Sequence, residues 1–245
     1  MVFNDTTNLT GIIQECEMLV FGGDYGAISG NTNLLKRFTA LSNKGLDRVV
    51  SKILSSDTRW QWDDNNQTDY PIATTNLVDG QQDYVLAVSH LKITGAEVMD
   101  QNGNYNVLKP IDQYDIQASG VALTEFMKTD GLPQYYDKRA DGVFLYPKPD
   151  TASVTLTEGL KLYFQRGPSY FESDDTTKAP GFTSIYHHLI AWHASFDYAM
   201  ANDMIDKAQG IKVMIDEGEA ELQDFFNRRD KDDQPKLQAR RVNYR

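Results

Sequence analysis

The sequence predicts an α+β protein: a helical bundle from the N- and C-terminal helices, an inserted antiparallel β lobe and an extended C-terminal arm. Apolar residues recur at helical spacing near both ends, and the period falls to two between about residues 70 and 166. Tight-turn dipeptides separate the strand-like stretches, which favours an antiparallel sheet or small barrel over βα units. The predicted domains are 1–57 with 182–229 for the bundle, 58–181 for the β-rich insertion with its connecting loops, and 230–245 for the arm.

The N-terminal region contains two predicted helices. In TGIIQECEMLVF (residues 10–21), Cys16 lies on the apolar face, so we expect it to pack in the core. The glycine-rich GGDYGAISGNT follows; it lacks the GK[ST] ending of a phosphate loop and is interpreted as a flexible hinge. A longer helix is predicted over 31–56, with Asn31 to Asn33 as N-cap candidates. Its apolar stripe consists of Leu34, Leu35, Phe38, Leu41, Gly45, Leu46, Val49, Ile53 and Leu54.

The central region contains five strand-like stretches: QQDYVLAV, LKITGAEVM, YNVLKP, VFLYPKP and VTLTEGLKLYFQR. In the last of them, alternate residues from Val154 to Phe164 are expected to face one way. A short helix is expected in IDQYDIQASG. The predicted turns are Asp79-Gly80, Asn102-Gly103, Asp130-Gly131 and Asp141-Gly142.

Helical spacing returns over residues 182–205 and 206–229. Thr183 or Ser184 is the expected N-cap of the first helix. The residues expected on its apolar face are Ile185, Leu189, Trp192, Phe196 and Ala199 or Met200. The expected apolar side of the second helix is Ile211, Met214, Ile215, Leu222 and Phe225.

Charge is unevenly distributed along the chain. The net charge of −11 should repel nucleic-acid phosphates, so tight binding of DNA is not expected. The final stretch PKLQARRVNYR is instead basic, and Pro235 ends any helix there. Such a tail is either a docking arm or a solvated, frayed terminus, and both interpretations stay open. With one cysteine, no signal peptide and no apolar run long enough to span a bilayer, a soluble intracellular protein is expected.

Three histidines of the stretch ESDDTTKAPGFTSIYHHLIAWHASFDYA could suggest a metal site. On a helix each residue turns by about 100°, so His187, His188 and His193 point in different directions and cannot converge on one ion. Asp174 and Asp175 fall in the preceding loop, where acids commonly form turns. We therefore expect no metal and no cofactor.

The stretch RWQWDDNNQTDYP holds the other candidate site. Asp63, Asn65 and Gln67 imitate the start of a calcium loop, but the required glycine and glutamate are absent further on. Trp60 and Trp62 share one face if the stretch is extended, where they could stack on a sugar or anchor a helix–sheet junction. No nucleophile elbow and no acid/base carboxylate pair is found, so an enzyme is not expected.

Between Thr58 and Ala201 the chain contains, in order, TRWQWDDNNQTDYPIATTNLVDGQQDYVL, LKITGAEVMDQNGNYNVLKPID, GLPQYYDKRADGVFLYPKP and LKLYFQRGPSYFESDDTTKAPGFTSIYHHLIAWHASFDYA. This succession resembles the head–tail connector adaptor proteins of tailed bacteriophages. None of the passages is a catalytic signature.

The resemblance implies a structural role in the virion at the head–tail junction, after synthesis in the host cytoplasm. Such adaptors form a ring, usually dodecameric, beneath the portal. The implied partners are the portal protein, neighbouring copies and a downstream tail or neck component, while DNA passes through the channel without specific binding and no membrane is involved. The C-terminal arm would reach the portal through Lys236, Leu237, Arg240, Arg241, Val242, Tyr244 and Arg245.

Two alternative functions stay open. The first is a carbohydrate-binding virion or surface module that uses Trp60 and Trp62; glycan binding that is abolished by Trp62→Ala would favour it. The second is an unrecognised metal-dependent hydrolase, which stoichiometric metal in the purified protein would favour.

Overall fold

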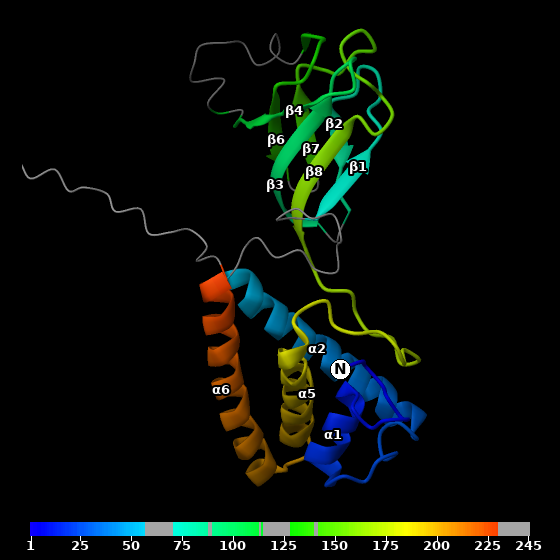
Figure 1. Ribbon diagram of the computed structural model, residues 1–245, viewed down its shortest axis with the longest axis vertical. Coiled ribbons are helices and arrows are strands. Elements are labelled where there is room, and N and C mark those ends of the chain that lie inside the picture. The colour runs from blue at the N-terminus through cyan, green and yellow to red at the C-terminus, as the bar shows by residue number, and fades with distance from the viewer. Residues whose placement is uncertain (57–70, 88–89, 113, 115–127, 140–141, 230–245) are drawn as a thin grey trace, which may run out of the picture. The chain divides into compact units, whose positions relative to one another are not determined.

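The structure, a computed structural model, describes residues 1–56, 71–87, 90–112, 114, 128–139 and 142–229 (Figure 1). The chain forms two compact units, one from Met1–Thr58 with Pro168–Arg245 and one from Arg59–Gly167. Of the elements that the structure describes in full, the helices lie in the first unit and the strands in the second, so the α+β class is confirmed. The boundaries expected for independent folding domains stay a prediction, and the arm of residues 230–245 lies outside the described residues.

The helical unit begins with α1 (Ile12–Phe21) and α2 (Thr32–Ser56). Both helices are where the sequence predicts them. Cys16 is fully buried, as expected. Asn31 caps α2, because its Oδ1 accepts hydrogen bonds from the backbone N–H groups of Asn33 and Leu34, each at 3.1 Å.

The glycine-rich loop between α1 and α2 is anchored rather than free. Glu17, fully buried on α1, accepts hydrogen bonds at Oε1 from the Ile28 N–H at 2.9 Å and the Ser29 N–H at 2.7 Å. The Ser29 hydroxyl donates to the same oxygen at 3.0 Å. The hinge interpretation missed this because a buried acid on an apolar helix face is not expected from periodicity.

The C-terminal part of this unit contains a 3₁₀ turn, η1 (Ser184–Tyr186), followed by α5 (His188–Ala201) and α6 (Ile205–Arg229). The predicted cap at Thr183 or Ser184 is wrong for the α-helix, which begins at His188, and Thr183 makes no side-chain cap hydrogen bond. Asp203, with a left-handed φ of 56°, forms the turn between α5 and α6.

Helix α5 is the centre of the unit, and it packs against α1, α2 and α6 (Figure 1). It is therefore buried on most sides, and the single apolar face predicted from the sequence is only part of its buried surface: Leu189 and Ala199 are buried as expected. Ile185 and Met200 are 66% and 49% exposed, whereas the polar residues His193 and Ser195 are buried. On α6, Phe226 is buried in place of the expected Phe225, which is 40% exposed. Both fit a helical repeat that begins at Leu222, at i+3 and i+4.

Two glycines bring the helices into close contact. A Cβ on Gly45 of α2 would lie 2.9 Å from the backbone oxygen of Ile190 and 3.0 Å from the Cβ of His193, both on α5. A Cβ on Gly218 of α6 would lie 2.7 Å from the Cδ2 of Leu189. Small residues are thus required where α2 and α6 cross α5.

Gly45→Ala is expected to lower the free energy of unfolding by about 1 to 3 kcal/mol, because the added methyl group meets backbone that cannot rotate away. Gly210→Ala is the matched control. Gly210 lies within α6, and a Cβ there would meet no atom within 4 Å, so alanine should stabilise by about 0.5 to 1 kcal/mol. Urea unfolding of both variants measures this. Equal effects of the same sign would contradict the close approach of α2 and α5.

Residues 168–178 belong to the helical unit. Phe171 stacks on Phe3 with ring centroids 4.6 Å apart, and the Phe3 N–H donates to the Lys178 carbonyl at 2.8 Å. The Asn43 amide of α2 brackets Phe171 by accepting from its N–H at 2.9 Å and donating to its carbonyl at 3.0 Å. The chain therefore packs against the helices well before residue 182, where their periodicity resumes.

The sheet unit contains two four-stranded sheets in its described part. The first has the order β1-β8-β3-β4 and is antiparallel, with β1 (Ile72–Thr75), β8 (Leu160–Arg166), β3 (His90–Met99) and β4 (Tyr105–Val107). The second has the order β2-β7-β6-β5, with β2 (Asp83–Val85), β7 (Gly142–Tyr146), β6 (Tyr135–Arg139) and β5 (Lys109–Pro110).

The second sheet is mixed, which corrects the expectation of a wholly antiparallel lobe. β5 pairs parallel with β6. Leu108 alone separates β4 from β5, so the chain continues from β4 into β5 without reversing. The chain thus passes directly from one sheet into the other.

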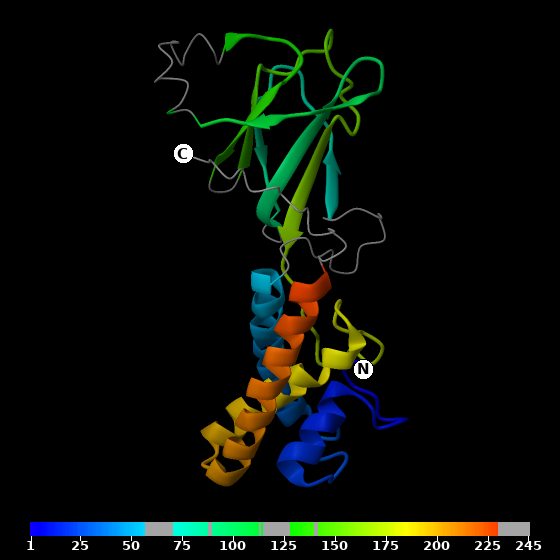
Figure 2. The same cartoon turned by 60° about the vertical axis from the view of Figure 1, so that its left-hand side comes forward.

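Both sheets, whose strands are drawn as arrows in Figure 2, contribute buried side chains to one hydrophobic core. The predicted alternation holds for Leu160, Leu162 and Phe164 of β8, which are buried, but β8 begins only at Leu160. Glu158, with a φ of 51°, turns the chain before it. The core consists of Leu77, Tyr84, Ile93, Ala96, Val98, Leu108, Tyr136, Val143, Leu145, Val154, Leu160, Leu162 and Phe164.

Two of the predicted turns have the left-handed glycine that a tight turn requires, with φ of 72° at Gly80 and 82° at Gly103. Gly142 instead opens strand β7, where a Cβ would lie 3.1 Å from the carbonyl oxygen of Tyr84. Most of the short helix expected near residues 111–120 lies outside the described residues.

Candidate functional site

The three histidines of the C-terminal helices have separate partners. His187 lies between η1 and α5, with Nε2 2.8 Å from the Phe182 carbonyl oxygen and Nδ1 3.0 Å from the Met1 carbonyl oxygen. His188 packs on Trp192 with ring centroids 4.3 Å apart. His193 faces α6. Within the described ranges, no group of three or more histidine, cysteine or acidic residues is placed to hold a metal ion.

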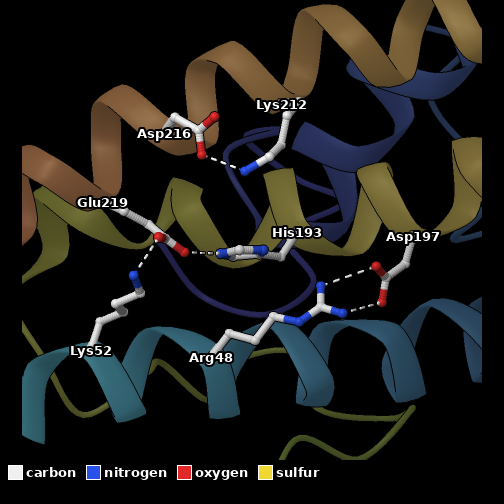
Figure 3. A network of polar contacts seen from close by, with 7 residues as sticks. All are labelled: Arg48, Lys52, His193, Asp197, Lys212, Asp216 and Glu219. Carbon is white, nitrogen blue, oxygen red and sulfur yellow. Dashed lines mark hydrogen bonds and ion pairs between the residues drawn. The ribbon is translucent and has the colours of Figure 1, made fainter. Parts of the chain in front are cut away.

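His193 belongs to a polar network that joins α2, α5 and α6 (Figure 3). Arg48 of α2 holds Asp197 of α5 through two hydrogen bonds of 3.0 and 3.1 Å. Lys52 of α2 lies 3.0 Å from a carboxylate oxygen of Glu219 on α6, and His193 Nε2 lies 3.1 Å from the other. The network therefore links each pair of these three helices.

Burial determines the electrostatics of this network. Burial of the His193 ring lowers its pKa below the ordinary value, and the Glu219 carboxylate opposes the shift only in part. The ring is thus neutral at pH 7. Its Nε2 lies 3.1 Å from a Glu219 carboxylate oxygen but makes no hydrogen bond of good geometry. Burial likewise lowers the pKa values of His187 and His188.

This network can hold helices together, but it lacks the parts of a catalytic site. Its two carboxylates, on Asp197 and Glu219, are engaged by Arg48 and Lys52. The thiol of Cys16 is buried, which raises its pKa to about 12 and keeps it protonated. A two-pronged arginine–carboxylate contact fixes the angle between two helices more firmly than a lysine contact does.

The other sequence candidates have simple positions or lie outside the described part of the chain. Asp175 forms a turn, because its Oδ2 accepts the Glu172 N–H at 2.7 Å and lies 3.7 Å from the Lys178 ammonium group. Trp60, Trp62 and the calcium-like stretch that follows lie outside it. So do the arm residues Lys236, Leu237, Arg240, Arg241, Val242, Tyr244 and Arg245.

The network itself was not predicted from the sequence. Its signal was present, since Arg48 and Lys52 are four residues apart on α2 and therefore share a face, as do His193 and Asp197 on α5. Opposite charge on two helices does not reveal which helices pack together. Glu219, on α6, had no such signal in its own helix.

The comparisons with known proteins give one family. The model of the SU10 adaptor protein family matches residues 35–242, a range that includes most of α2 and all of the sheet unit, α5 and α6. No curated protein matches the chain. None of the helices that the structure describes is long and apolar enough to cross a membrane.

Proposed function

This chain belongs to the SU10 adaptor protein family, a family of phage head–tail adaptors, and on that basis we propose that it is a connector subunit that docks beneath the portal. Membership makes it a structural adaptor protein of a phage virion. The proposed ring is dodecameric and surrounds part of the DNA channel. Its other partners are neighbouring copies and the next tail or neck component.

The observation that carries this proposal is the family match over residues 35–242, which spans both units rather than one. The helical unit suits a ring subunit, because its helices pack closely at two glycines and are joined by ion pairs. Both features hold the helices in fixed positions relative to one another. We also propose that the protein has no enzymatic activity. The net charge of −11 supports a channel wall along which DNA moves without adhering.

The C-terminal arm is the proposed portal contact. The stretch from Lys236 to Arg245 carries four bases and no acid, in contrast to the acidic chain as a whole. Arginine suits such a contact because its planar guanidinium group can hold a carboxylate through two hydrogen bonds. Leu237, Val242 and Tyr244 would add buried apolar surface.

Mixing the purified full-length protein with its purified portal ring tests the function. Light scattering after size-exclusion chromatography should give a complex whose mass exceeds that of the portal by several copies of this chain. Standard-size interfaces have dissociation constants of about 1 μM or lower. A portal that elutes at its own mass, with the chain present at about 10 μM, would refute the proposal.

A further inference from the structure

The outward face of α6 is uncovered and acidic. Its exposed residues recur four and three positions apart, so they form one straight stripe along the helix. Val213, at the middle of the stripe, is 58% exposed. The α6 stripe consists of Asp206, Gly210, Val213, Glu217, Ala220 and Asp224.

The outward face of α2 has the same spacing and the opposite charge. Over its length α2 carries five bases and one acid, whereas α6 carries six acids and four bases. The residues of this face that lie four and three positions apart on α2 are all exposed. The α2 stripe consists of Asn33, Arg37, Ala40, Lys44, Asp47 and Ser51, with Lys36 and Arg48 beside it.

Contacts inside the molecule leave these charges unbalanced. Three bases of α6 are engaged, because Lys207 donates to the Val20 carbonyl, Lys212 pairs with Asp216 and Arg228 pairs with Asp224. Asp206 and Glu217 have no ion pair among the described residues. On α2, Arg48 and Lys44 share the single carboxylate of Asp197, and the Lys44 ammonium group is 4.0 Å from it and 66% exposed.

We propose that the α6 stripe of one copy packs against the α2 stripe of the next copy. The inference rests on the proposed ring and identifies its subunit interface. The two surfaces differ, so each copy binds one neighbour through its α6 stripe and the other neighbour through its α2 stripe. This is the head-to-tail contact that a closed ring needs. The alanines, the glycine and the serine between the charges let the two helices approach closely.

An apolar groove beside the α6 stripe adds surface to bury. Met200 of α5 and Ile205 of α6 are 49% and 47% exposed, and Val213 belongs to both groove and stripe. The groove is lined by Phe196, Met200, Ile205, Ala208, Gln209, Lys212 and Val213.

The size of this contact predicts weak association in the absence of a template. A helix of 25 residues is about 37 Å long and about 10 Å wide, which gives roughly 400 Å² on each side of the seam. A stable interface needs about 800 Å² on each partner. Neighbouring copies should therefore join mainly when the portal holds them side by side.

Exchange of charge tests the interface. Variant A carries Lys36→Glu and Lys44→Glu, so its α2 and α6 faces are both acidic. Variant B carries Asp206→Lys and Glu217→Lys, so its α6 stripe holds two bases and one acid and both of its faces are basic. Each alone places like charges together and should bind the purified portal ring at least about tenfold more weakly than the unmodified chain. An equal mixture of A and B alternates opposite faces and should restore binding to within about twofold.

A charge control separates the interface from net charge. Lys92→Glu with Lys109→Glu makes the same change in net charge as variant A, on exposed strand residues of the sheet unit, and should leave portal binding unchanged. Normal portal binding by variant A or variant B alone would refute the proposed interface. An equal loss of portal binding in the control would refute it as well. Failure of the mixture to recover overturns it too, since the α2 stripe would then contact the portal or DNA. If the unmodified chain itself does not bind, the proposed function fails instead.

Discussion

Removal of residues 235–245 is expected to weaken binding to the portal at least about 100-fold, or about 2.7 kcal/mol, without altering the stability of either unit. The sequence of this segment, with Pro235 and no apolar periodicity, predicts that contact with a partner orders it on binding. Ordering costs about 1 to 2 kcal/mol per residue. Charge-assisted hydrogen bonds from Arg240, Arg241 and Arg245 must offset that cost.

The control for the truncation keeps the positive charges of the arm and removes the planar guanidinium groups. A chain with Arg240→Lys, Arg241→Lys and Arg245→Lys should bind between the two extremes, because lysine supplies a point charge but no two-pronged contact. Binding isotherms against the purified portal measure all three proteins, and thermal unfolding verifies their folding. A truncated chain that folds and binds like the full chain would show that the arm is dispensable.

Glu17→Ala is expected to cost about 3 kcal/mol of unfolding free energy, because it leaves the buried N–H group of Ile28 and the partly buried N–H group of Ser29 without an acceptor. The loss should be centred on the loop between α1 and α2, since the carboxylate is what attaches that loop to α1.

Native-state hydrogen exchange distinguishes this local effect from general destabilisation. In the unmodified chain the amides of Ile28 and Ser29 should be protected, and in Glu17→Ala they should exchange far faster than amides of α5. Glu17→Gln keeps one acceptor oxygen and should lose less than half as much stability. Equal protection of Ile28 in Glu17→Ala and the unmodified chain would mean that Glu17 does not anchor the loop.

The spacing of apolar residues predicted where the helices and strands lie better than it predicted which of their faces are buried and which strands pair. The long helices α2 and α6 and the alternating strand β8 each bury one face, and that is the pattern periodicity detects. Helix α5 is buried on several sides, so a single apolar stripe predicted only part of its buried surface. The parallel pairing of β5 with β6 depends on contacts between distant residues, which spacing along the chain does not record.

The candidate site shows the same limit. The divergence of His187, His188 and His193 follows from helix geometry alone and agrees with their separate partners. The pairing of His193 with Glu219 depends on how α5 and α6 cross, which Gly218 permits by its lack of a side chain. Buried Glu17 was missed for a similar reason, because its partners lie in a loop without regular structure.

Electron microscopy of the purified portal, with and without the full-length chain, shows whether this chain is a ring-forming adaptor beneath the portal. We expect a second ring on one face of the portal, with the C-terminal residues 236–245 of each copy traced onto portal subunits and α6 of each copy beside α2 of its neighbour. A portal without added density at saturating protein, or copies attached singly with no contact between neighbours, would contradict it.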